Sequence, residues 1–355
     1  MRTSFLLLAV LLLVAAGCKQ QESEQEPATT TDTLAVEGET RIKNIRQLTF
    51  EGENAEAYWS FDESKLVFQA SHGDMECDQI FTMNADGSDM KMVSSGKGRT
   101  TCAYWLPGDE KIIYSSTFAA DDGCLPPPDR SMGYVWKLYP EFDIYVANKD
   151  GSDVQVLSAT DGYDAEATVS PTGDKIVFTS TRDGDPEIYT MNIDGTDVKR
   201  LTNMKGYDGG PFFSWDGKKI VFRANRPEGP EEEAAYKELV TSNLVRPTNL
   251  EIYVMDADGS NLQQVTDNGA ANFAPFMHPD GERIIFASNM DGDSPMNFDL
   301  YIINIDGTGL ERVTYFEEFD GFPMFTRDGK TLVFCSNRNN MKHGDTNIFV
   351  ADWVD

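Results

Sequence analysis

The chain has 355 residues, of which 40% are hydrophobic and 25% are charged, so it can bury a large core and lacks the composition of a disordered protein. Its 59 Asp and Glu residues exceed its 30 Lys and Arg residues, which gives a formal net charge of -29. This charge would repel a phosphate backbone, so nucleic acid is not an expected partner.

The N-terminus has the pattern of a bacterial export signal. A positive start at Met1-Arg2 is followed by an apolar run over residues 5–16 and by Ala15-Ala16-Gly17 ahead of Cys18. The run is too short to cross a bilayer, which needs roughly 20 residues. Because the small residues before Cys18 resemble a lipobox, we expect residues 1–17 to be a lipoprotein signal peptide and Cys18 to be lipidated.

Residues 18–41 are rich in Gln, Glu and Thr and contain no aromatic residue, which predicts a flexible tether. The stretch Gln20 to Glu24 is similar to the acidic signals of surface lipoproteins, so we expect an outer membrane lipoprotein. Its orientation, toward the periplasm or the cell surface, stays open. A lipid is the expected means of membrane attachment, since no other stretch has 18 consecutive apolar residues.

The remainder of the chain, residues 42–355, repeats one unit six times. Each copy contains a short strand, a turn, a strand such as Lys175 to Phe178, a loop, a strand such as Glu187 to Met191, an Asp-Gly turn and a short outer strand. This period predicts an all-β protein, a six-bladed β-propeller with four strands per blade. The chain stops at Asp355 before a sixth outer strand, and residues 45–49 have the sequence of one. We therefore expect the N-terminal strand to complete the last blade and close the ring.

The repeat resembles that of the TolB propeller family. The resemblance extends over about residues 42–353 and is carried by segments such as Ser170 to Arg182, Ile188 to Thr196 and Arg200 to Thr202. It implies a propeller of six TolB-type repeats, here without the α/β domain that precedes the propeller in TolB. It does not select one function, because the same repeat occurs in propellers of serine peptidases and in oligogalacturonate lyases.

Motifs for catalysis or metal binding are sparse. Loops such as Asp256 to Ser260 lack the spacing of an EF-hand and predict hairpin turns. No nucleophile elbow, zinc-protease motif or Walker loop occurs. Of the three histidines, His278 is expected in a surface turn, and His72 and His343 are expected in solvated loops of neighbouring blades, with a shared site as the alternative.

The cysteines divide by position. Cys335 falls in an apolar strand and is expected to be buried. Cys77, Cys102 and Cys124 fall in blades 1 and 2 of an exported chain, where one disulfide among them is expected without a determined pairing.

The strand topology predicts a ligand site at one mouth of the central channel. Six polar residues occupy equivalent positions at the start of the first strand of each blade, and three arginines end the second strand of blades 3, 4 and 6. A ring of carboxylates there could hold a cation such as calcium or the positive groups of a peptide; the alternative is that the side chains cap loops and pair with the arginines. The ring positions are Asn54, Thr100, Asp164, Asp208, Asn272 and Asp320, and the arginines are Arg182, Arg226 and Arg338.

Two insertions should lie at the same mouth. Residues 118–141 bring Tyr134, Trp136 and Tyr139 beside three prolines, and residues 227–249 predict about two turns of helix. Together they could roof the channel and offer Tyr134 and Trp136 to a ligand, or they could pack onto the blades beneath.

Two functional hypotheses remain. The first is a non-enzymatic binding or scaffold module, expected to be a monomer, that holds a peptide, protein or glycan of the envelope and needs no cofactor. The second is a hydrolase or polysaccharide lyase that acts through the channel-mouth acids. No nucleophile, base and oxyanion donor can be assigned as a set, which favours the first hypothesis.

Overall fold

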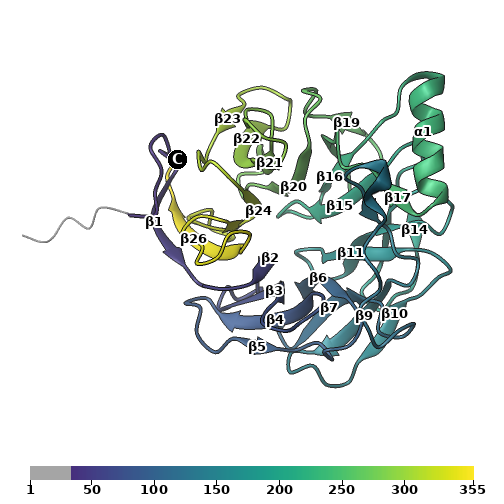
Figure 1. The fold of residues 1–355 in the computed structure, drawn as a ribbon, viewed down its shortest axis with the longest axis horizontal. Coiled ribbons are helices and arrows are strands. Elements are labelled where there is room, and N and C mark those ends of the chain that lie inside the picture. The colour runs from purple at the N-terminus through teal and green to yellow at the C-terminus, as the bar shows by residue number, and fades with distance from the viewer. Residues whose placement is uncertain (1–32) are drawn as a thin grey trace, which may run out of the picture. The chain divides into compact units, whose positions relative to one another are not determined.

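The computed structural model describes residues 33–355, so the predicted signal peptide, Cys18 and most of the predicted tether lie outside the described residues. From Leu34 to Asp355 the chain forms one compact unit. Six antiparallel four-stranded sheets follow one another around a centre, as the predicted six-bladed propeller requires (Figure 1). The predicted fold class is confirmed.

The strands of each blade follow the chain from the centre outward. Blade 1 contains β2 (Glu53–Trp59), β3 (Lys65–Ser71), β4 (Gln79–Asn84) and β5 (Lys91–Met92). Blade 2 contains β6 (Thr100–Trp105), β7 (Lys111–Ser116), β9 (Asp143–Asn148) and β10 (Gln155–Ser158). Blade 3 contains β11 (Asp164–Val169), β12 (Lys175–Ser180), β13 (Glu187–Asn192) and β14 (Lys199–Arg200). Blade 4 contains β15 (Asp208–Phe213), β16 (Lys219–Ala224), β18 (Glu251–Asp256) and β19 (Gln263–Gln264).

Blades 5 and 6 complete the ring. Blade 5 contains β20 (Asn272–Met277), β21 (Arg283–Ser288), β22 (Asp299–Asn304) and β23 (Glu311–Arg312). Blade 6 contains β24 (Asp320–Phe325), β25 (Thr331–Ser336), β26 (Asn347–Trp353) and, as its outer strand, β1 (Ile42–Gln47). β1 runs antiparallel to β26, with Ile42 opposite Trp353 and Gln47 opposite Phe349. The predicted closure is therefore present, and Figure 1 shows the purple first strand beside the yellow last one.

The segment just before β1 differs from the prediction of a tether up to residue 41. Leu34 packs against the core, and the carboxylate of Glu39 has no exposed surface. It accepts hydrogen bonds from Arg338, whose guanidinium also donates to the carbonyl of Leu34. Residues 34–41 are thus part of the folded unit, because a buried arginine at the end of β25 provides a partner that composition alone could not reveal.

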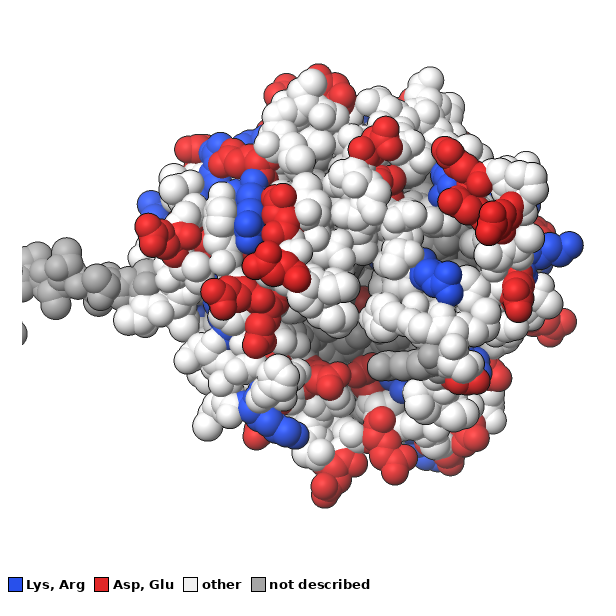
Figure 2. All heavy atoms as spheres, turned by 45° about the horizontal axis from the view of Figure 1, so that its top comes forward, with Lys and Arg blue, Asp and Glu red and all other residues white. Residues whose placement is uncertain are grey.

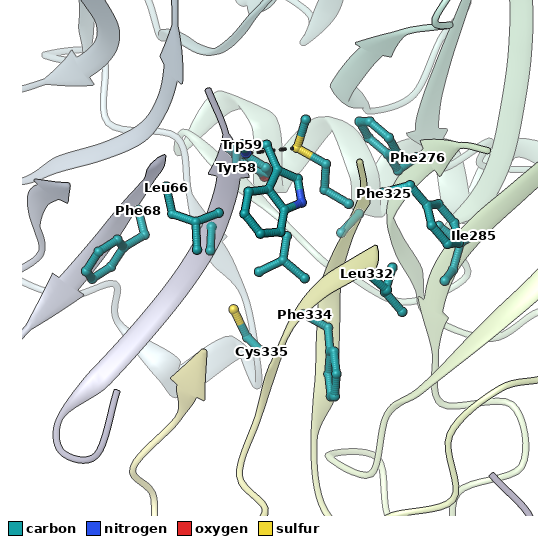
Figure 3. Close-up of a cluster of buried hydrophobic side chains, with 14 of the residues drawn as sticks. Tyr58, Trp59, Leu66, Phe68, Phe276, Ile285, Phe325, Leu332, Phe334 and Cys335 are labelled. Carbon is teal, nitrogen blue, oxygen red and sulfur yellow. Dashed lines mark hydrogen bonds between the residues drawn. The ribbon is translucent and has the colours of Figure 1, made fainter. Parts of the chain in front are cut away.

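The core lies in the faces between neighbouring blades. The second and third strands of each blade carry uninterrupted buried runs, such as Leu66 to Phe68 in β3 and Leu332 to Cys335 in β25. Such runs arise because both faces of a blade are covered by its neighbours. Figure 3 shows this packing between blades 1, 5 and 6, where the backbone N–H of Trp59 also donates to the sulfur of Met324 at 3.4 Å.

The two insertions meet each other. Within the first, a short 3-10 turn, η1 (Arg130–Met132), precedes β8 (Trp136–Lys137), which pairs with β17 (Leu244–Val245) of the second. The predicted helix is present as α1 (Gly229–Thr241), and at 13 residues it is longer than the two turns expected. No helix among residues 33–355 is long and apolar enough to cross a membrane.

Candidate functional site

The six predicted ring residues are buried at the starts of the inner strands, and Asn54 also lines the groove described below. All six side chains are fully buried, with 0% exposure. Three of them are carboxylates held by the arginines that end the second strand of the same blade. Asp164 pairs with Arg182 at 3.0 Å, Asp208 with Arg226, and Asp320 with Arg338 at 2.8 Å.

The other three ring residues serve the loops and strand ends around them. Asn54 donates to the carbonyl of Thr346 at 2.8 Å, and Asn272 donates to that of Leu250 at 2.7 Å. Thr100 is hydrogen-bonded to the Ser116 hydroxyl. The alternative interpretation, capping and ion pairing, therefore describes these six positions and the three arginines. The three arginines and Ser116 lie at or just beyond the end of the second strand of the same blade, whereas Thr346 and Leu250 precede the third strand of the neighbouring blade.

The channel is lined by residues two positions further along each inner strand. There the pairing of the first two strands shifts in every blade, which marks a β-bulge. The bulge residue has a φ between 49° and 59° in all six cases, in the left-handed region. These residues share one small cavity of about 30 Å³; they are Glu56, Cys102, Glu166, Gly210, Ala274 and Phe322.

Large side chains fill the channel on one side of this cavity. They come from the positions two residues beyond the bulges, and most are aromatic. Tyr58 lies 5.3 Å from Phe212 and 5.6 Å from Tyr104, and Phe212 lies 5.5 Å from Phe276, measured between ring centres. The cavity therefore has an aromatic floor.

The carboxylates in the cavity differ in their partners. Glu166 forms an ion pair with Arg223 and accepts hydrogen bonds from the Thr179 hydroxyl and the backbone N–H of Gly210. Among the described residues, no Lys or Arg lies within ion-pair distance of Glu56, whose hydrogen-bond partner is the thiol of Cys102 at 3.8 Å. Burial, aided by the nearby charge of Glu166, raises the pKa of Glu56 to about 7.

A larger groove of about 620 Å³ adjoins the cavity through Phe322, which lines both. Its walls come from blades 1, 5 and 6 and from the first insertion. They carry four acidic side chains and one histidine but no Lys or Arg; the acids are Glu53, Asp78, Glu317 and Glu318. Burial raises the pKa of Asp78, and burial with the nearby charge of Asp78 raises that of Glu53. On the face drawn in Figure 2, acidic side chains likewise outnumber basic ones.

Tyr134 and Trp136 occupy different environments. Tyr134 is 50% exposed and lines the groove. The ring of Trp136 lies under the guanidinium of Arg223, at 5.2 Å, and 6.4 Å from the ring of Tyr207. Trp136 thus packs onto blade 4 while its strand joins the two insertions, and Tyr134 of the first insertion lines the groove.

The cysteines and histidines divide as follows. Cys77 and Cys124 form a disulfide, so one bridge among the three candidate cysteines is confirmed; Cys102 remains a thiol and Cys335 is buried. The expectation of a surface turn for His278 is wrong, because its ring is 5% exposed and lies 4.6 Å from that of Phe325.

His72 and His343 do not share a site. The Nε2 of His72 is 2.9 Å from the amide oxygen of Asn54, whereas the side chain of His343 is 94% exposed at the groove. Within residues 33–355 no group of three His, Cys, Asp or Glu side chains is arranged to hold a metal ion.

Glu56 gives a prediction for stability. Between about pH 4.5 and 7 the native state binds more protons than the unfolded state, so the free energy of unfolding should fall as the pH rises. Glu56→Gln should remove this loss and stabilise the protein at about pH 8 by up to about 3 kcal/mol, with little difference near pH 4.5. Chemical unfolding at both pH values measures it.

The matched control is Glu166→Gln. Its carboxylate is paired with Arg223, so this change should destabilise the protein rather than stabilise it at about pH 8. If the free energies of unfolding of Glu56→Gln and the parent chain differ by the same amount at both pH values, the ionised carboxylate of Glu56 does not destabilise the native state.

The sequence profile of the TolB beta propeller domain matches residues 127–244 and 236–349, which together span more than half of the chain. The chain belongs to this family. No curated protein sequence matches it.

Several solved structures share the propeller fold. A putative TolB from Agrobacterium tumefaciens superposes with a TM-score of 0.57 at 19% identity, over 87% of this chain and 94% of that one. TolB from Acinetobacter baumannii gives 0.55 at 20% identity, over 85% of this chain and 64% of that one. An oligogalacturonate lyase from Vibrio parahaemolyticus superposes with a TM-score of 0.50 at 15% identity, over 89% of this chain and 94% of that one. At these identities the likenesses show the fold alone.

Proposed function

We propose that this TolB-family chain is a lipid-anchored binding protein of the bacterial envelope, and that its groove holds a cationic segment of a peptide or protein partner. The observation that carries the proposal is the composition of the groove, whose lining contains four carboxylates and several apolar side chains but no Lys or Arg. Of the four carboxylates, Asp78 is paired with Arg99, at 3.2 Å. Such a surface attracts and orients a positively charged partner by long-range electrostatic forces, which salt weakens. The TolB-like propeller itself supports a binding or scaffold role.

The apolar part of the groove complements its charge. Phe319, Phe322, Met296 and Tyr134 line the same walls as the acids, and Met296 is 60% exposed. Aromatic and methionine side chains are enriched at protein interfaces because they bury much area at low cost in side-chain entropy. An amphipathic cationic segment fits this mixture better than a neutral glycan does.

The lyase alternative loses its main support. It placed the chemistry on the ring of acids, and the structure holds Asp164, Asp208 and Asp320 in buried ion pairs. The likeness to the Vibrio lyase extends to the fold alone.

Binding can be tested with charge variants of the groove. The mature chain, immobilised through a C-terminal tag, should capture a partner from envelope extract, and Glu317→Gln with Glu318→Gln should reduce this capture by about tenfold at low salt. The control is Glu231→Gln with Glu238→Gln, which makes the same charge change on the exposed face of α1. Equal capture by both double variants, or capture insensitive to salt, would refute the groove as the binding site.

Lipidation gives a separate prediction. Mass spectrometry of the mature protein from its native host should find an acylated N-terminal residue at Cys18, and Cys18→Ser should release the chain from the membrane fraction. An unmodified N-terminus at another position would contradict the anchor. Fractionation of the native protein then tests the proposed outer membrane location.

A further inference from the structure

The cavity next to the groove has two unlike halves. Glu56, Cys102 and Glu166 come from blades 1 to 3 and make one side polar. Gly210, Ala274 and Phe322 come from blades 4 to 6 and make much of the other side apolar, although the guanidinium of Arg223 lies over Gly210. A ligand group that enters from the groove past Phe322 would therefore meet a carboxylate on one side and hydrocarbon on the other.

The charges of the cavity do not balance. Its lining contains two carboxylates and one guanidinium, that of Arg223. Arg223 is occupied by Glu166 and by the hydroxyl of Tyr207, which accepts its hydrogen bond at 2.8 Å. Glu56 is left with the thiol of Cys102 as its neighbour. The carboxylate of Glu56 is half-buried, and such a group is costly unless a cation or several donors meet it, so the site lacks one positive group.

The size of the cavity restricts that group. A volume of about 30 Å³ holds a particle of the size of a water molecule, since one water needs roughly 10–15 Å³ by this measure. An ammonium group is of that size, whereas a guanidinium is a larger plane. The apolar side of the cavity and Phe322 suit the methylene groups that would follow an ammonium group toward the groove.

We infer that this cavity binds a primary ammonium group at the end of an unbranched alkyl chain, with the carboxylate of Glu56 as its counter-ion. The inference rests on the proposed function and deepens it: the groove holds the cationic segment, and the cavity takes the side chain of one of its lysines. Lysine is thereby selected over arginine.

The pH dependence of binding follows from the groups around Glu56. Cys102 of β6, Glu166 of β11, Arg223 of β16 and Asp78 ahead of β4 all act on its charge. Since the ammonium group needs the ionised carboxylate and the pKa of Glu56 lies near 7, affinity should rise from about pH 6 to about pH 8. In Glu56→Gln this rise should be absent.

The test uses small probes and the mature chain. Titrations followed by NMR or calorimetry would use the capped pentapeptide acetyl-Gly-Gly-Lys-Gly-Gly-amide, its Arg and norleucine counterparts, and n-butylamine. The Lys peptide should bind about tenfold more tightly than either counterpart, and Glu56→Gln should weaken it by about tenfold. Glu110→Gln makes the same change at an exposed side chain that is not among the cavity residues; it is the control and should bind as the parent chain does.

The outcomes separate two sources of the ammonium group. Binding of n-butylamine that depends on Glu56 supports the site for a free alkylamine, and binding of the Lys peptide alone supports a lysine side chain presented by a backbone. Equal affinity for Lys and Arg peptides, no binding of either amine, or binding unchanged in Glu56→Gln would overturn the inference. If Glu56→Gln does not fold, Glu56→Asp withdraws the carboxylate by one methylene and should weaken binding in the same way.

Failure of this inference is distinct from failure of the proposed function. A partner captured from envelope extract through Glu317 and Glu318, whose binding survives acetylation of its lysines, would leave the groove in place and refute the ammonium site. Butylamine binding in the absence of any captured partner would support the ammonium site and leave the proposed partner binding without support.

Discussion

Deletion of residues 42–50 should lower the free energy of unfolding by about 5 kcal/mol or more, and thermal melting of the mature protein measures it. The deleted strand β1 buries Ile42, Ile45 and, just beyond it, Leu48. Each such side chain contributes roughly 1.5–3 kcal/mol when it is fully buried. The deletion also exposes the edge of β26, whose unpaired backbone groups would favour pairing with a second chain.

A deletion of equal length in residues 19–27 is the matched control, because these residues precede the folded unit. It should leave the melting temperature unchanged. If the two deletions melt alike, the ring is held closed by the contacts between blades and not by β1. Size-exclusion chromatography of the 42–50 deletion should in addition find larger species that come from exposed β26 edges.

Arg338→Met should cost about 3–5 kcal/mol of stability, the usual penalty when one partner of a buried ionic group is removed. Arg338 is 2% exposed and lies between two carboxylates that have no exposed surface, Glu39 at 2.9 Å and Asp320 at 2.8 Å. Without the guanidinium these two negative charges would face each other in the core. Burial already raises the pKa of Asp320 with the arginine present.

Two comparisons check this reasoning by chemical unfolding. Lys330→Met removes an exposed ion pair with Asp328 in the same blade and should change stability by less than about 1 kcal/mol. The triple change Glu39→Gln, Arg338→Met, Asp320→Asn removes all the charges and should recover most of the loss. A triple variant as unstable as Arg338→Met would show that the loss comes from packing of the arginine side chain and not from the carboxylates.

The repeat made the fold predictable, whereas the site depended on a local irregularity. Each copy of the repeat predicts the same strands and turns, so an ambiguous segment in one copy can be interpreted from the others. The channel-facing position is set by a β-bulge, and its occupants include Glu56, Gly210 and Phe322, which share no residue type. The six polar residues two positions earlier form the stronger pattern, and that pattern reflects buried ion pairs within a blade and hydrogen bonds to the neighbouring blade.

Other features followed from contacts between distant parts of the chain. The groove acids Glu53 and Glu317 come from opposite ends of the sequence and meet because the ring closes. The order of residues 34–41 depends on Arg338. A sequence pattern indicates which residues are neighbours along a strand. It does not indicate partners on different blades unless the order of the blades around the ring is known.

The contacts of Arg338 with Leu34 and Glu39 also limit the distance between the propeller and the membrane. If the lipid is on Cys18, as proposed, the linking segment ends at Leu34, 16 residues after the cysteine. Fully extended, 16 residues span about 55 Å, and a random coil of that length averages only about 22 Å. The binding groove would then stay within a thin layer next to the bilayer. A partner would need to be anchored in the same membrane or to extend toward it.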